Sequence, residues 1–241
     1  METKVDKSKF VEPKLCLSNM KYYTVRNSIL RAVKQNINRF NGKLIDLGCG
    51  IMPYREIIIS EGRIDEYIGV DLMYSDYHNR VKPDIIWNGF DIPFEDNSID
   101  CLIATEFLEH YHDTGHIFKE IFRVLKKDGL FFATIPFIWN LHESPYDEYR
   151  FTPFSLTKYA INNGFSEVEV RPLGGWNYSL AQFLGLWVTH FCHKKSKIIK
   201  IIIPRIIYPF YYLLVRSDKV PSEFDNNENS MFNSLSLVAL K

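Results

Sequence analysis

Short apolar runs alternate with helical stretches along the first 136 residues, and this alternation constrains the fold more than any other feature of the chain. Two stretches, residues 22–40 and 116–125, carry apolar side chains every three or four positions, which is the period of an α-helix. The apolar runs have the length and composition of buried strands: residues 44–47, 67–70, 85–87, 99–104 and 130–135. Strands and helices in alternation predict an α/β fold, with a doubly wound parallel sheet and helices on both faces.

The pattern changes after Pro136. A helix over residues 153–162 precedes a strand over 165–170, and Gly164 stands where a helix C-terminus favours glycine. Two apolar, aromatic helical stretches follow at 179–192 and 197–215, before a last strand at 235–240. We expect a single domain over residues 1–241, made of a tail at 1–20, a core at 21–172, a helical insertion or cover at 173–233 and the last strand at 234–241.

Charge and cysteine content limit the classes of partner and compartment. Lys and Arg total 29, as do Asp and Glu, so the formal net charge is zero and no overall basic field draws the chain to nucleic acid. The four cysteines are scattered without a CxxC pair, which suits a reducing cytoplasm and gives no metal-ligand spacing. The charged N-terminal segment lacks the apolar stretch of a secretory signal. We therefore expect a cytoplasmic protein.

The strongest local signal is the segment Leu-Ile-Asp-Leu-Gly-Cys-Gly, which ends at Gly50. A buried strand carries an acid, Asp46, and runs into a tight turn in which Gly48 and Gly50 let backbone amides approach a ligand. A dinucleotide site would need a third glycine three residues after Gly50, but that position is Pro53. The turn is therefore a poor cradle for a pyrophosphate, which argues against an NAD-type oxidoreductase.

This turn resembles the first motif of the class I S-adenosylmethionine-dependent methyltransferases. The resemblance implies that Asp46, Gly48, Cys49 and Gly50 hold the methionine end of the cofactor. A second match, Tyr-Ile-Gly-Val-Asp-Leu, ends in Asp71 and Leu72 about twenty residues later. In the family an acid at this place accepts both ribose hydroxyls, and two vicinal donors suit one carboxylate.

Two further segments resemble this family in the expected order. The run from Asn88 to residue 100 is similar to a D-x-x-x-L-P-F-x-D-x-S-F-D pattern, which places Asn88, followed by Gly89, at the adenine; Asp91 is the alternative if the loop is shorter. Thr105 and Glu106 begin a segment ending in Glu-His, and a later Arg-Val-Leu-Lys run leads into the fifth strand. The resemblance implies a seven-stranded sheet with an antiparallel last strand, S-adenosylmethionine as cofactor, and methyl transfer.

The polar loop over residues 139–152 is expected beyond the carboxyl ends of the strands, where ligands of open α/β sheets bind. It resembles a segment of methyltransferases associated with glycan and lipid pathways, which implies a small-molecule, glycan-linked or lipid-linked acceptor methylated at oxygen. A hydroxyl acceptor must lose a proton, and His110 and His142 are the candidate bases, with Asp147 orienting or replacing one of them. The structural alternative is an Asp147–Arg150 ion pair with Thr152 capping the next helix.

The histidines after the fourth predicted strand raise the possibility of a metal site. His112 and His116 have the spacing of paired metal ligands on a helix, together with His110, but no HExxH pattern accompanies them, so we expect no metal site. A non-catalytic protein that retains the cofactor fold is the remaining rival to an enzyme.

Residues 187–215 combine lysines and histidines with apolar runs, and they allow two interpretations. In one, two helices pack on the core and cover the sheet edge, with a basic linker between them. In the other, an interfacial helix docks on the inner face of a membrane to reach a lipid-linked acceptor. Pro204 and Pro209 are expected to break the second helix into short pieces, which suits a surface lid better than a membrane span.

Overall fold

The structure is a computed structural model that describes residues 7–73, 81–222, 224 and 229–241. Residues 1–6 of the expected N-terminal tail lie outside the described residues. The same holds for residues 223 and 225–228 in the acidic loop before the last strand.

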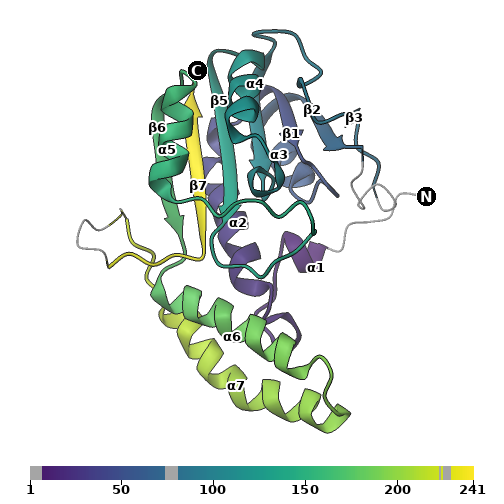
Figure 1. Cartoon of the computed structure of the whole chain (residues 1–241), viewed down its shortest axis with the longest axis vertical. Helices are drawn as coiled ribbons and strands as arrows, with labels where there is room; N and C mark the ends of the chain where they lie inside the picture. The colour runs from purple at the N-terminus through teal and green to yellow at the C-terminus, as the bar shows by residue number, and fades with distance from the viewer. Residues whose placement is uncertain (1–6, 74–80, 223, 225–228) are drawn as a thin grey trace.

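Seven strands form one sheet in the order β3-β2-β1-β4-β5-β7-β6 (Figure 1). The first five run parallel, whereas β7 pairs antiparallel with both β5 and β6. The doubly wound sheet and its antiparallel last strand are thus confirmed. The strands are β1 (Asn41–Leu47), β2 (Arg63–Leu72), β3 (Ile85–Trp87), β4 (Ile99–Thr105), β5 (Leu125–Pro136), β6 (Ser166–Leu173) and β7 (Ser234–Leu240).

Helices cover both faces of the sheet because successive strand residues point to opposite sides. Leu44 packs with the core beneath α2 (Tyr23–Asn36) and α3 (Arg55–Glu61), whereas its neighbour Ile45 packs with the core beneath α4 (Thr114–Val124) and α5 (Pro153–Asn162). The short helices are α1 (Lys7–Phe10), η1 (Leu17–Asn19), η2 (Ile37–Arg39) and η4 (Leu108–His110).

The ends of α5 show why its boundaries could be read from the sequence. Thr152 accepts a hydrogen bond from the Ser155 amide while the Ser155 side chain accepts one from the Thr152 amide, which is a capping box, and Pro153 occupies the first turn. Gly164 follows the helix with a φ of 98°, a left-handed conformation that glycine adopts without a steric penalty. The helix spans Pro153–Asn162, as predicted.

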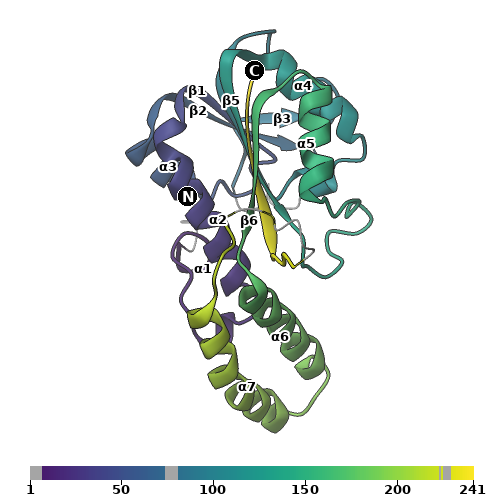
Figure 2. The ribbon, with the colours of Figure 1, turned by 90° about the vertical axis from the view of Figure 1, so that its left-hand side faces the viewer.

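Two long helices, α6 (Trp176–Cys192) and α7 (Lys197–Ser217), form a hairpin that extends away from the sheet (Figures 1 and 2). Its base is fixed to the N-terminal part of the chain, because Gln182 contacts the Thr24 hydroxyl and donates to the Lys21 carbonyl, 3.0 Å away. The backbone of Met20 lies against Gly185, where an added Cβ would approach it to 2.2 Å. The hairpin therefore does not cover the sheet edge as one interpretation expected.

The expectation that two prolines break α7 is wrong. The helix is continuous from Lys197 to Ser217, with Pro204 and Pro209 inside it. A proline removes one backbone donor and crowds the preceding turn, but the rest of the ladder still forms when flanking residues favour the helix. Arg205 also donates from its guanidinium to the Ile201 carbonyl, 2.8 Å away, which satisfies an acceptor beside the first interruption.

Candidate active site

The carboxyl ends of β1, β2 and β4 lie at the same end of the sheet, where the loop after β5 passes close to them (Figure 1). A cavity of about 690 Å³ opens between these segments and the N-terminal helices. The predicted site residues that line it are Gly48, Cys49, Gly50, Asp71, Leu72, Thr105, Glu106, His110 and His142. Parallel strands thus bring together residues that are almost a hundred positions apart in the chain.

The turn after β1 is shaped by its first glycine. The Gly48 amide donates to the Val70 carbonyl over 2.8 Å, and the residue has a φ of 70°. A Cβ at Gly48 would lie 2.2 Å from the Phe107 ring, so a larger residue could not occupy this position without displacing that ring. Glycine here leaves the backbone open toward the cavity, as a tight ligand turn requires.

The two predicted acids of β1 and β2 lie at different depths. Asp71 lines the cavity, is 5% exposed, and accepts a hydrogen bond of 3.0 Å from the Leu72 amide. Asp46 is 2% exposed and does not line the cavity; the Tyr67 hydroxyl donates to its Oδ2, and its Oδ1 has no hydrogen-bond partner among the described residues. Burial raises the pKa of Asp46 to about 7, although the Tyr67 hydrogen bond opposes the shift.

The residues predicted to contact adenine lie away from the cavity lining. Asn88 is exposed, and its side-chain oxygen accepts from the Phe90 amide at 3.0 Å. The Gly89 carbonyl accepts from the Tyr111 hydroxyl at 2.6 Å, and the alternative residue Asp91 has a side chain that is 83% exposed. Asn88 follows β3, which pairs with β2 beside Asp71, but its side chain does not line the cavity, and adenine contact by Asn88 stays a prediction.

The predicted acceptor side is organised around Asp147. Its Oδ2 lies 3.1 Å from His142 Nδ1, and the Arg150 guanidinium donates to both carboxylate oxygens over 2.7 and 2.9 Å. The Asp147–Arg150 ion pair of the structural interpretation is therefore present, and Asp147 also contacts the ring of His142. A catalytic role for Asp147 stays a prediction. These charge-assisted bonds hold the pKa of Asp147 at about 2 despite its buried side chain, which by itself raises the pKa. Asp147 itself does not line the cavity.

Glu109 is a residue at this site that the sequence interpretation passed over. It is fully buried beside His110, and His110 lies edge-to-face with His142 at a ring-centroid distance of 4.7 Å. Burial, reinforced by the nearby charge of Glu106, raises the pKa of Glu109 well above its usual range, and burial lowers the pKa of His110. Its position in the sequence, directly before His110 and three residues after Glu106, could have marked Glu109 as a candidate site residue.

The comparisons with known proteins agree with this arrangement. Residues 45–133, which include the glycine turn, Asp71 and Glu109, match the model of a methyltransferase domain family. This match is in keeping with the resemblance of the motifs to the class I methyltransferases. The family match thus agrees with the motifs over this part of the chain, and the sheet order confirms the predicted fold.

Two curated relatives match over little more than a third of the chain. Squalene methyltransferase 1 of Botryococcus braunii is 31% identical over 103 residues, and sterol 24-C-methyltransferase of Schizosaccharomyces pombe is 32% identical over 99 residues. Each match covers 37% of this chain and 26% of the relative. The chain therefore aligns with about a quarter of the length of these relatives.

Solved structures share the fold over most of the chain. An S-adenosylmethionine-dependent methyltransferase from Archaeoglobus fulgidus superposes with a TM-score of 0.57 and 16% identity, covering 90% of this chain and 93% of that one. Phosphoethanolamine N-methyltransferase 2 of Haemonchus contortus, solved with S-adenosylhomocysteine, gives a TM-score of 0.55 and 20% identity, covering 89% and 52% respectively. At these identities the likeness shows the fold.

Proposed function

We propose that this methyltransferase transfers the methyl group of S-adenosylmethionine to an oxygen of a small-molecule, glycan-linked or lipid-linked acceptor. The observation that carries the proposal is a single cavity that joins the glycine turn and Asp71 on one side to His110 and His142 on the other. The cofactor supplies an electrophilic methyl group on a sulfonium, so the protein must mainly align the acceptor and exclude water.

The residues at the first two strand ends fit this cofactor. Gly48 keeps the turn clear of a side chain, and the buried carboxylate of Asp71 faces the cavity where two neighbouring ribose hydroxyls can share it. Asp46 is a buried acid two residues before the turn, and its Oδ1 has no hydrogen-bond partner in the described part of the chain. A ligand with cationic groups near it would stabilise its ionised form. Pro53 replaces the glycine that a dinucleotide would need.

The residues across the cavity fit an acceptor that must be activated. His110 and His142 line the cavity, and Asp147 fixes the ring of His142 through Nδ1. An imidazole held in this way presents its other nitrogen to the ligand. We assign activation of the acceptor oxygen to these two histidines.

The helical hairpin supports a lipid-linked acceptor. Exposed apolar side chains recur every three or four positions along both helices: Trp176, Leu180, Phe183 and Trp187 on α6, and Ile198, Ile202, Ile206, Phe210 and Leu213 on α7. The chain has no net charge, yet the segment from Arg171 to Ser217 contains lysines and arginines and no Asp or Glu. An apolar stripe beside basic residues is the composition of an interfacial helix that binds anionic lipid.

Helix α7 is also long and apolar enough to cross a membrane, and 17% of its most apolar stretch is buried among the described residues. Lys200 and Arg205 lie within it, and charged groups are costly at the centre of a bilayer. We propose that the hairpin lies on the cytoplasmic face of a membrane and brings the cavity to its acceptor there.

Titration calorimetry with S-adenosylmethionine, S-adenosylhomocysteine and NAD tests the cofactor assignment on the full chain. We expect binding of the first two and none of NAD, because the turn lacks the third glycine of a pyrophosphate site. Binding of NAD without binding of S-adenosylmethionine would overturn the proposed function. Binding without methyl transfer to any acceptor would favour a non-catalytic protein.

A further inference from the structure

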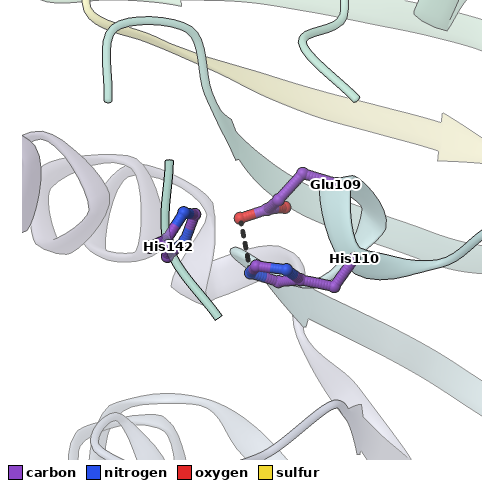
Figure 3. Close-up of side chains that lie close together, drawn as sticks. All are labelled: Glu109, His110 and His142. Carbon is purple, nitrogen blue, oxygen red and sulfur yellow. Dashed lines mark ion pairs between the residues drawn. The ribbon is translucent and has the colours of Figure 1, made fainter. Parts of the chain in front are cut away.

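Glu109 carries its carboxyl group deep in the protein. Its exposed fraction is 0%, and neither carboxylate oxygen has a hydrogen-bond partner among the described residues. His110 Nε2 lies 3.6 Å from its Oε1, as the dashed line in Figure 3 marks. Buried carboxylates in proteins are hydrogen-bonded, paired with a cation, or bound to a metal ion.

The two histidines beside Glu109 are oriented so that Nε2 is the nitrogen left without a proton. His110 Nδ1 lies 3.1 Å from the Tyr146 carbonyl, and His142 Nδ1 lies 3.1 Å from Asp147 Oδ2. Both partners can only accept, so Nδ1 carries the proton in each neutral ring and Nε2 keeps its lone pair. A ring fixed through Nδ1 by a carboxylate or carbonyl oxygen is the usual arrangement around a metal-ligating histidine.

The three side chains converge on one point. One oxygen of Glu109 and one ring nitrogen each of His110 and His142 lie within 4.8 Å of one another (Figure 3). Ligand atoms around one ion with bonds of ~2.1 Å are ~3.0–3.5 Å apart, so the most widely separated atoms have to approach by ~1 Å or more when an ion binds. We propose that Glu109, His110 and His142 bind a divalent first-row transition-metal cation. Two imidazoles and one carboxylate favour such ions over Mg²⁺ or Ca²⁺, which prefer oxygen ligands.

The position of this group gives the cation a role, and that role rests on the proposed methyl transfer. His110 and His142 line the same cavity as Asp71, and three protein ligands leave coordination positions open toward it. An acceptor hydroxyl bound there has a lowered pKa and releases its proton to water. Its oxygen then forms a bond to the methyl carbon as the carbon–sulfur bond breaks and the electron pair stays on sulfur. The two histidines thus activate the acceptor oxygen as ligands of the cation.

The site differs from the one that histidine spacing suggested. His112 is exposed, and His116 Nε2 lies 4.0 Å from Asp91, so neither joins the group around Glu109. His112→Gln is therefore a matched control, since it removes a neighbouring imidazole from the same segment without touching the proposed ligands.

Equilibrium dialysis of the chelator-stripped full chain against Mn²⁺, Zn²⁺ and Mg²⁺, with bound metal measured by elemental analysis, tests the site. We expect retention of Mn²⁺ or Zn²⁺ in preference to Mg²⁺. Glu109→Gln and His142→Gln should each weaken binding at least about tenfold, and Asp147→Asn about 10–100-fold by releasing the His142 ring. His112→Gln should bind as the wild type does. Thermal melting of each variant identifies any that fails to fold.

Two results would overturn the proposal: no retention of Mn²⁺ or Zn²⁺ by the wild type, or undiminished retention by folded Glu109→Gln and His142→Gln. Calorimetry with S-adenosylmethionine on the same samples separates this outcome from failure of the proposed function. Cofactor binding without metal binding rejects the cation alone. Metal binding without cofactor binding supports the metal site but rejects the proposed methyl transfer.

Discussion

Asp71 is the side chain on which cofactor affinity should depend most. It is buried at the cavity wall, and replacing it with alanine leaves two ribose hydroxyls without their shared acceptor. A charge-assisted hydrogen bond in a buried site is worth ~1.5–3 kcal/mol, so Asp71→Ala should weaken binding of S-adenosylmethionine at least about tenfold in calorimetry. Asp65→Ala, at an exposed side chain of the same strand that does not line the cavity, is the control. Equal affinity of Asp71→Ala and wild type would remove the ribose assignment.

Asp46 should make the stability of the cofactor-free protein depend on pH. Its carboxyl ionises near 3.8 in the unfolded chain, whereas burial raises the pKa to about 7 in the folded protein. Unfolding therefore releases a proton between these values, and the contribution of Asp46 is fully present below pH 4 and is lost as the pH rises through 7.

Asp46→Asn should remove this dependence. The unfolding free energy of the wild type should fall relative to the variant by at most about 1.4 kcal/mol for each pH unit between 4 and 7, and the difference should level off above 7. Urea denaturation of both proteins at pH 5 and pH 8 measures it. Parallel pH profiles would show that Asp46 is ionised in the folded state.

His142 and Asp147 should matter for turnover and little for cofactor binding. His142→Ala removes a group that faces the acceptor, and Asp147→Asn releases the ring it holds. Loss of acid–base activation typically costs ~10²–10⁴-fold in rate, so we expect kcat to fall within that range while S-adenosylmethionine affinity stays within about twofold. Steady-state kinetics at saturating acceptor are the measurement. Wild-type turnover in both variants would make this loop structural.

Single residues were predictable where geometry leaves one choice. Gly48 must be glycine because Phe107 occupies the space of a Cβ, and a strand-end acid such as Asp71 has a fixed place in a parallel sheet. The sequence places Glu109 beside His110, but its burial could not be predicted, since a buried acid and a solvated one look the same in a sequence. Asn88 was assigned to adenine from the spacing of a motif, but its side-chain oxygen accepts a hydrogen bond from the Phe90 amide within its own loop.

Elements were predictable where local signals and tertiary packing agree. Helix α5 has its cap, its N-terminal proline and its terminal glycine in sequence, and its bounds match the prediction. Helix α7 was expected in pieces because proline counts as a helix breaker, but it runs unbroken through Pro204 and Pro209. The helix therefore tolerates the loss of two backbone donors.

The hairpin of α6 and α7 should bind anionic membranes. Co-sedimentation with anionic and neutral vesicles at low and high salt should show salt-sensitive binding to the anionic ones, because each basic residue near such a surface contributes ~1 kcal/mol. Replacing Lys194, Lys195, Lys197 and Lys200 with Gln should abolish it.

The control replaces four exposed lysines of the sheet region, Lys34, Lys119, Lys127 and Lys158, with Gln, which keeps the change in net charge the same. If this control loses as much binding as the hairpin variant, net charge and not the hairpin governs the association. Absence of binding at low salt, with a concentration-dependent dimer in its place, would assign the apolar stripes to a second copy of the chain.

At the scale of the whole molecule, the alternation of strands and helices was sufficient to predict the sheet, because a right-handed crossover leaves few other topologies. The placement of the hairpin was not predictable, since its contacts with Met20 and Thr24 join segments more than 150 residues apart. The molecule therefore has two regions: the sheet with its cavity at the carboxyl ends of the strands, and the basic, apolar hairpin of α6 and α7, which extends away from the sheet (Figure 2).

The most direct test of the account is transfer of a labelled methyl group from S-adenosylmethionine to fractionated cell extract, with aqueous and lipid fractions assayed separately. The account predicts label in an acceptor that the full chain methylates, recovered most strongly with the lipid fraction, linked through oxygen, and lost with Asp71→Ala. No label in any fraction, from protein that binds the cofactor in calorimetry, would contradict it.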